Sequence, residues 1–161
     1  MNKARCERLK YNVEKQGAKS VYTMLADARR LDDFFSFDQI LLDAPCSGSG
    51  TLNMENPNLE KTFTKELIEK SVKVQTALLK KAINLLKPGK EMVYSTCSIL
   101  SCENEDIVKN CLKGGKAEVV PITFEGIEKF PLLPTKLEGT LLIKPTRYYE
   151  GFFVAKIRRN I

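Results

Sequence analysis

The sequence predicts a single α/β domain built on an open parallel sheet with an antiparallel edge. Its 161 residues are enough for one such domain and too few for two. Hydrophobic residues make up 43% of the chain and charged residues 29%, which are ordinary values for a globular protein. Strand and helix patterns alternate at first and strand patterns alone follow, an order typical of this architecture.

The opening segment predicts a helix followed by a strand. Apolar residues share one face of a helix over residues 2–16, and Gly17 supplies a stop. Residues 21–25 read Val-Tyr-Thr-Met-Leu, a composition that favours a strand. Asp27 falls just beyond the end of that predicted strand.

A second strand and a long helix are predicted on either side of a loop of small residues. Residues 37–43 contain the run Ile-Leu-Leu, which is typical of a parallel strand covered on both faces. The segment 44–50 reads Ala-Pro-Cys-Ser-Gly-Ser-Gly, which predicts an irregular loop. Residues 65–86 repeat apolar positions at helical spacing, with Thr64 as the cap and Lys-Pro-Gly at 87–89 as the end.

The second half of the chain continues with a third strand, a short helix and further strands. Residues 91–95 predict the third strand, which Thr-Cys-Ser follows directly. A helix is predicted over 102–112 with Ser101 as its cap. Acidic residues near its start would favour the positive end of the helix dipole, namely Glu103, Glu105 and Asp106. The remaining strand patterns cover residues 118–122, 140–143 and 151–157.

Composition excludes several kinds of chemistry. The chain contains no histidine, which rules out Ser-His, Cys-His and His-ligated zinc sites within it. Its five cysteines are odd in number and no secretory signal precedes them, so a disulfide framework is not expected. The net charge of +6 suits a polyanionic partner such as nucleic acid. No apolar run approaches the ~20 residues of a membrane helix, so we expect a cytoplasmic protein.

Two cysteines follow strands at the edge where ligands bind in open parallel sheets. Cys46 follows the second predicted strand and Cys97 follows the third. A single crossover helix joins these two strands, so the strands should be neighbours and the thiols should face each other across a cleft. Asp27 and Asp43 end strands at the same edge and are further candidates for the site.

Simpler interpretations apply to the other candidates. A cysteine is most often a small buried apolar side chain, which is our interpretation of Cys6, Cys102 and Cys111. No metal site is predicted, because no histidine completes a ligand set with Cys97 and its neighbours. The Gly-Ser-Gly at 48–50 lacks the ending of a phosphate-binding loop and by itself is a turn. The absence of a Cys-x-x-Cys motif argues against a thiol-redox role.

Two cysteine motifs occur in this sequence, and together they indicate a protein family more specifically than either motif alone. Residues 43–51 read Asp-Ala-Pro-Cys-Ser-Gly-Ser-Gly-Thr and residues 94–98 read Tyr-Ser-Thr-Cys-Ser. Glu-Asn-Glu follows at 103–105, and Glu-Gly-Phe-Phe-Val-Ala-Lys closes the chain at 150–156. Along its full length the chain strongly resembles the Sun-type RNA cytosine-5 methyltransferases. The resemblance implies a Rossmann-like class I methyltransferase fold, S-adenosylmethionine as cofactor, and ribosomal or transfer RNA as partner.

The resemblance also implies a mechanism. Carbon 5 of cytosine is a poor nucleophile, and a thiolate that adds at carbon 6 makes it reactive toward the methyl group of S-adenosylmethionine. Cys97 would be the attacking nucleophile, and Cys46 would assist release of the methylated base. Asp43 would either meet the charge that develops at ring nitrogen 3 or hold the cofactor, and the sequence does not divide these roles.

Cofactor contacts are further implied at Asp27, beside the adenine, and at Pro45, near the methionine portion. A cap for the turn at 28–30 is the alternative role of Asp27. The first two strands of the family fold and its glycine-rich loop do not occur in this sequence, which leaves residues 21–25 without a partner strand. We therefore expect residues 1–161 to be an N-terminally truncated catalytic domain that binds S-adenosylmethionine poorly alone, or one that a second chain completes. A non-catalytic RNA-binding or assembly module is the alternative function.

Overall fold

The computed structural model describes residues 2–52, 61 and 63–161, and the chain divides into two compact units, Met1–Asp32 and Asp33–Ile161. The first unit contains the helix α1 (Lys3–Lys15), close to the predicted bounds. Asn2 caps its start by accepting the Arg5 N–H at 3.2 Å. Gly17 ends the helix, as the sequence predicts, and has a φ of 69°. The N–H of Ala18 then donates to the Val13 carbonyl in the last turn of the helix.

The predicted strand at 21–25 is wrong. These residues form no strand within the described part of the chain, and Tyr22 is 99% exposed. A strand needs a neighbour to complete its backbone hydrogen bonds, and side-chain preference alone does not supply one. The first unit then ends with a 3₁₀ turn, η1 (Ala28–Arg30).

In the described part of the second unit, six strands form one mixed sheet. Its spatial order is β1-β2-β6-β5-β4, with β3 also paired to β6. Only β1 and β2 run parallel among these pairs, so the sheet is less parallel than the sequence predicts. The strands are β1 (Phe37–Asp43), β2 (Leu86–Thr96), β3 (Ala117–Val120), β4 (Leu132–Leu133), β5 (Leu141–Ile143) and β6 (Phe152–Arg159).

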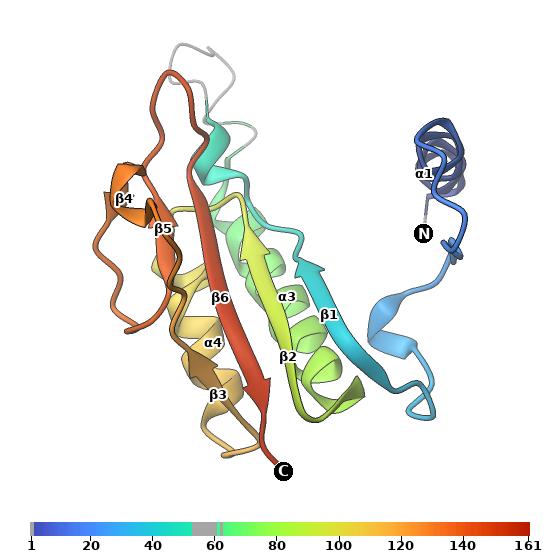
Figure 1. Ribbon diagram of the computed structural model, residues 1–161. Helices are drawn as coiled ribbons and strands as arrows, with labels where there is room; N and C mark the ends of the chain where they lie inside the picture. The colour runs from blue at the N-terminus through green and yellow to red at the C-terminus, as the bar shows by residue number, and fades with distance from the viewer. Residues whose placement is uncertain (1, 53–60, 62) are drawn as a thin grey trace. The chain divides into compact units, whose positions relative to one another are not determined.

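Two helices of the second unit, α3 (Lys65–Leu85) and α4 (Glu105–Leu112), lie side by side on one face of the sheet (Figure 1). They close a core built on fully buried side chains, among them Leu79, Leu86, Tyr94, Val108, Phe153 and Ile157. Leu41 on β1 points away from this core and is 74% exposed. The predicted coverage of β1 on both faces is therefore wrong for this unit. Among the described residues, no helix has both the length and the apolar character to span a bilayer.

Element boundaries differ from the predictions where backbone turns intervene. β2 starts directly after α3, at Leu86, and its register with β1 shifts around Gly89, which has a φ of 73°. The predicted helix over 102–112 is replaced by a 3₁₀ turn, η3 (Ser101–Glu103), followed by α4. Ser101 is not the cap, and Asn104 stands at the cap position of α4 without a side-chain cap bond.

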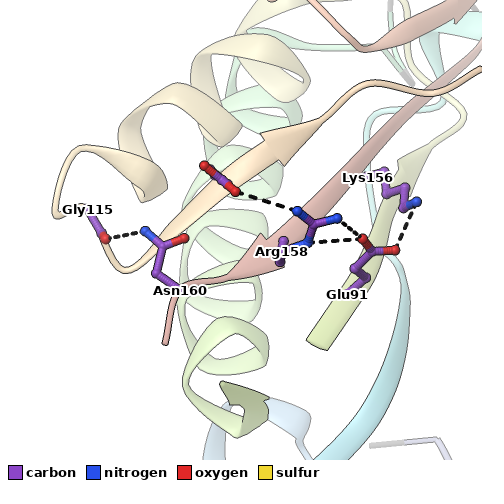
Figure 2. A network of polar contacts seen from close by, with 6 residues as sticks. Glu91, Gly115, Lys156, Arg158 and Asn160 are labelled. Atoms are coloured by element: carbon purple, nitrogen blue, oxygen red, sulfur yellow. Dashed lines mark hydrogen bonds and ion pairs between the residues drawn. The ribbon is translucent and has the colours of Figure 1, made fainter. Parts of the chain in front are cut away.

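Charged side chains join β2 to β6 far from the strand ends that carry the cysteines. Glu91 on β2 accepts Lys156 Nζ at 2.8 Å and Arg158 Nη2 at 2.6 Å (Figure 2). These bonds lower the pKa of Glu91. Because these side chains are exposed to solvent, the ion pairs contribute little to stability, and together they favour the observed antiparallel register.

Candidate active site

The site forms where β1 and β2 end. The two strands are parallel neighbours, with Asp43 beside Ser95, so their following loops emerge at the same edge. Ser95 donates its hydroxyl to Asp43 Oδ1 at 3.0 Å, and the Ala44 N–H continues the ladder to the Ser95 carbonyl at 2.9 Å. The crossover through α3 therefore brings the two cysteine loops together, as the order of the elements predicts.

The thiols of Cys46 and Cys97 are in direct contact. Their sulfur atoms lie 3.2 Å apart, and both side chains are partly buried. Burial first, and then the hydrogen bond with Cys97, raise the pKa of the Cys46 thiol well above its ordinary value. The raised pKa favours the protonated form of Cys46, and either thiol can be the donor in the contact between the two sulfurs.

Backbone contacts fix the first cysteine loop against the second and against β6. The Gly50 N–H donates to the Cys97 carbonyl at 3.0 Å, and the Gly151 N–H donates to the Gly50 carbonyl at 2.8 Å. A Cβ atom on Gly50 would collide with the backbone of Gly151, so glycine is needed for this close approach. The loop also contains a short 3₁₀ turn, η2 (Ser49–Thr51), which the sequence does not predict.

Glu103 belongs to the site, which the sequence analysis missed. It was expected to favour the dipole of a helix, whereas it is buried and accepts hydrogen bonds from Ser47 and Ser98. Asn104 is also turned inward, since it donates to the Ser98 carbonyl at 2.8 Å and accepts the Thr96 hydroxyl at 2.6 Å. The sequence does place Glu-Asn-Glu only a few residues after Thr-Cys-Ser, which could have indicated a role in the site. Acidic residues at this position are equally typical of the start of a helix.

The remaining predicted site residues differ in their surroundings. Asp43 and Pro45 are exposed, and both precede Cys46 by no more than three residues. Asp27, in the first unit, caps η1 and accepts the Arg29 N–H at 3.0 Å and its guanidinium at 2.6 Å. Those bonds lower the pKa of Asp27 to about 2. The structure therefore shows the capping role for Asp27.

The other three cysteines lie outside the site. Cys6 and Cys111 are both partly buried, whereas Cys102 is exposed. The expected burial of Cys102 is therefore wrong. Cys102 sits in η3, whose inward-facing contacts are made by Glu103 instead. Within residues 2–52, 61 and 63–161, no cluster of Cys, Asp and Glu has the arrangement of a metal site.

Comparisons with known proteins support one family. Residues 1–158 match the family described as 16S rRNA methyltransferase RsmB/F. Ribosomal RNA small subunit methyltransferase F of Aliivibrio salmonicida is 39% identical over 156 residues, which cover 92% of this chain and 32% of that protein.

Solved structures agree with the sequence comparison. NSun6 from Pyrococcus horikoshii, solved with SFG, superposes with a TM-score of 0.82 at 31% identity, covering 98% of this chain and 39% of that one. A methyltransferase homolog protein from Pyrococcus horikoshii superposes with a TM-score of 0.78 at 29% identity, covering 99% of this chain and 51% of that one.

The fold is thus shared with known methyltransferases. The α/β arrangement is the Rossmann-like fold of class I methyltransferases, as the sequence predicts. The chain spans about a third of the length of the curated relatives that it matches. Because the family match extends over nearly all of its residues, the chain belongs to the 16S rRNA methyltransferase RsmB/F family.

Proposed function

We propose that this chain carries the catalytic region of an enzyme that methylates carbon 5 of a cytosine in ribosomal RNA. S-adenosylmethionine would donate the methyl group, and Cys97 would form a covalent bond to carbon 6 of the base. The observation that supports this most is the pair of thiols 3.2 Å apart in the two loops that follow β1 and β2. We expect the enzyme to act in the cytoplasm.

The similar proteins support this substrate and this cofactor. The matching family and the similar curated proteins are named for methylation of ribosomal RNA of the small subunit, which favours ribosomal over transfer RNA. The similar NSun6 structure contains SFG, an analogue of S-adenosylmethionine. The net charge of +6 suits an RNA partner.

The exposed groups beside the thiols suit a cationic cofactor. The Asp43 carboxylate is exposed and negatively charged, which favours a positively charged sulfonium nearby. Pro45 would form an apolar wall beside the methionine portion. Asp27 fits less simply, because Arg29 already donates to both of its carboxylate oxygens. An adenine contact at Asp27 would require Arg29 to move.

The two thiols would divide the work of the reaction. The Cys97 sulfur adds to carbon 6 and forms a C–S bond, and the electron pair of the 5,6 double bond becomes available at carbon 5. When bound, S-adenosylmethionine supplies an electrophilic methyl group. Asp43 would meet the charge that develops at ring nitrogen 3, or hold the cofactor.

Release of the product reverses the first bond. Transfer of the carbon 5 proton to solvent water restores the 5,6 double bond and expels the Cys97 sulfur as a thiolate. Cys46 lies in contact with that sulfur, so it is placed to support this step. A protonated Cys46 also stabilises Cys97 as a leaving thiolate by donating its S–H.

A pair of variants tests the proposal. Cys46→Ala, Cys97→Ala and the control Cys111→Ala are each incubated with 16S ribosomal RNA and S-adenosylmethionine, and covalent protein–RNA adducts are separated under denaturing conditions. We expect adduct to accumulate with Cys46→Ala and to be absent with Cys97→Ala. The opposite result would exchange the roles of the two thiols. RNA binding without methylation or adduct, by an unaltered chain that is saturated with S-adenosylmethionine, would instead favour the non-catalytic module.

Calorimetric titration with S-adenosylmethionine, with light scattering for the mass, is the first measurement to make. The sequence predicts weak binding by the chain alone, so a micromolar Kd would contradict that prediction. Tight binding by an assembly larger than one chain would support completion of the sheet by a second chain.

A further inference from the structure

Glu103 is a buried carboxylate that contacts both cysteine loops at once. It has no exposed surface. Its Oε1 accepts the Ser47 N–H at 2.7 Å, and its Oε2 accepts the hydroxyls of Ser47 and Ser98 at 2.6 Å each. Ser47 directly follows Cys46, and Ser98 directly follows Cys97. The carboxylate is therefore an acceptor shared by the residues next to the two thiols.

The hydrogen bonds around Glu103 have one consistent direction. Because a carboxylate only accepts, the Ser98 hydroxyl must donate to it. Ser49 must then be the donor in its 2.8 Å contact with Ser98. The Ile99 N–H in turn donates to Ser49, and the Leu100 N–H donates to Ser98. The chain of donors that runs from Ile99 through Ser49 and Ser98 thus crosses between the two loops and ends on Glu103.

A carboxylate at this position does more than fill space. Burial of a charge is unfavourable unless its oxygens are well hydrogen-bonded, and for stability alone an apolar side chain of similar size often serves as well. Three donors at 2.6–2.7 Å have the short distances of charge-assisted bonds. These bonds fix the orientation of Ser47 and Ser98. Each serine is joined by one peptide bond to a cysteine, so the bonds also orient Cys46 and Cys97.

The charge of Glu103 also acts on the Cys46 thiol. It adds to the effects of burial and of the Cys97 hydrogen bond that raise the pKa of Cys46. Tyr94 also helps to hold the backbone of Glu103 in place, since its hydroxyl donates to the Glu103 carbonyl at 2.8 Å. The charge of Glu103 therefore favours a protonated Cys46, and its hydrogen bonds hold the two loops that place Cys46 against Cys97.

We propose that Glu103 is a positioning residue that holds the Cys46 and Cys97 thiols in contact by binding the serine that follows each of them. It acts through the thiols and touches neither substrate nor cofactor. Its importance for methyl transfer rests on the proposed function, whereas its effect on the thiol pair does not.

Phenylarsine oxide tests the thiol pair directly, because its arsenic forms bonds to two adjacent sulfurs and releases water. We compare the unaltered chain with Glu103→Gln and with Glu125→Gln, a control at an exposed glutamate in the loop after β3. Glu103→Gln should lower the affinity for the arsenical about tenfold, and the control should not change it. Unaltered affinity in a Glu103→Gln chain that circular dichroism shows to be folded would overturn the proposal.

Methylation of 16S ribosomal RNA provides the second measurement. Glu103→Gln should lower kcat about 100-fold, because a small misplacement of a nucleophile has that effect, and leave KM for RNA nearly unchanged. A rise in KM with unchanged kcat would contradict a positioning role. If the unaltered chain binds S-adenosylmethionine and RNA but does not methylate the RNA, the proposed function fails, and the arsenical affinity still decides the role of Glu103.

A milder variant keeps the test open if Glu103→Gln does not fold. Ser47→Ala removes one of the three hydrogen bonds and leaves the carboxylate and the Ser98 bond in place. It should lower the arsenical affinity about threefold to tenfold. An unchanged affinity in this variant would likewise overturn the proposal.

Discussion

Replacement of Gly50 by alanine should separate the first cysteine loop from the start of β6. A Cβ atom at this position would lie 2.7 Å from two backbone atoms of Gly151, closer than real Cβ atoms approach their neighbours. Neither backbone is free to withdraw, because Gly50 donates to the Cys97 carbonyl at 3.0 Å and accepts the Gly151 N–H at 2.8 Å. Relief of the collision must therefore stretch or break at least one of these bonds.

The cost follows from the bonds at risk. Each backbone hydrogen bond contributes about 1 kcal/mol, and a buried group left unpaired costs about 1–3 kcal/mol. Loss of one or both bonds should therefore destabilise the second unit by about 2–4 kcal/mol. With a urea m value of about 2 kcal/mol/M, the midpoint of unfolding should fall by about 1–2 M.

Urea unfolding followed by circular dichroism measures this shift. Gly114→Ala is the matched control, because a Cβ on Gly114 meets nothing within 4 Å. The control should stay within about 0.5 kcal/mol of the unaltered chain. If Gly50→Ala unfolds at the same urea concentration as Gly114→Ala, the argument from close backbone approach is refuted.

Three further perturbations test other parts of the structure. Tyr94→Phe should cost about 1–3 kcal/mol, because it removes the hydroxyl that donates to the buried Glu103 carbonyl, and an unchanged urea midpoint would contradict this. Gln75→Leu should stabilise the fold by about 1 kcal/mol, because neither amide atom of this buried side chain has a partner within the described residues; a lower melting temperature would refute it. Hydrogen peroxide should convert the Cys46 and Cys97 thiols into an intramolecular disulfide with formation of water, and peptide mapping that finds no such link would show the thiols to be apart.

Local sequence patterns determined much of the fold and the place of the site. The glycine after α1 predicted its end, and the apolar spacing predicted α3 to within one residue at its C-terminus. The alternation of strand, helix and strand predicted that Cys46 and Cys97 would meet, because two parallel neighbours joined by one crossover end at the same edge. These features depend on the spacing of apolar residues and on the order of elements along the chain, and both can be read directly from the sequence.

Tertiary structure decided which groups pair across the chain. Residues 21–25 have the composition of a strand but form none, because a strand also needs a neighbour. Leu41 lies in an apolar run yet is exposed, because α3 and α4 pack on the other face of the sheet. Glu103 looked like a helix-start acid and instead accepts donors from two loops that are far apart in sequence. The donors of a buried carboxylate are fixed only once the chain has folded around it, so no local pattern specifies them.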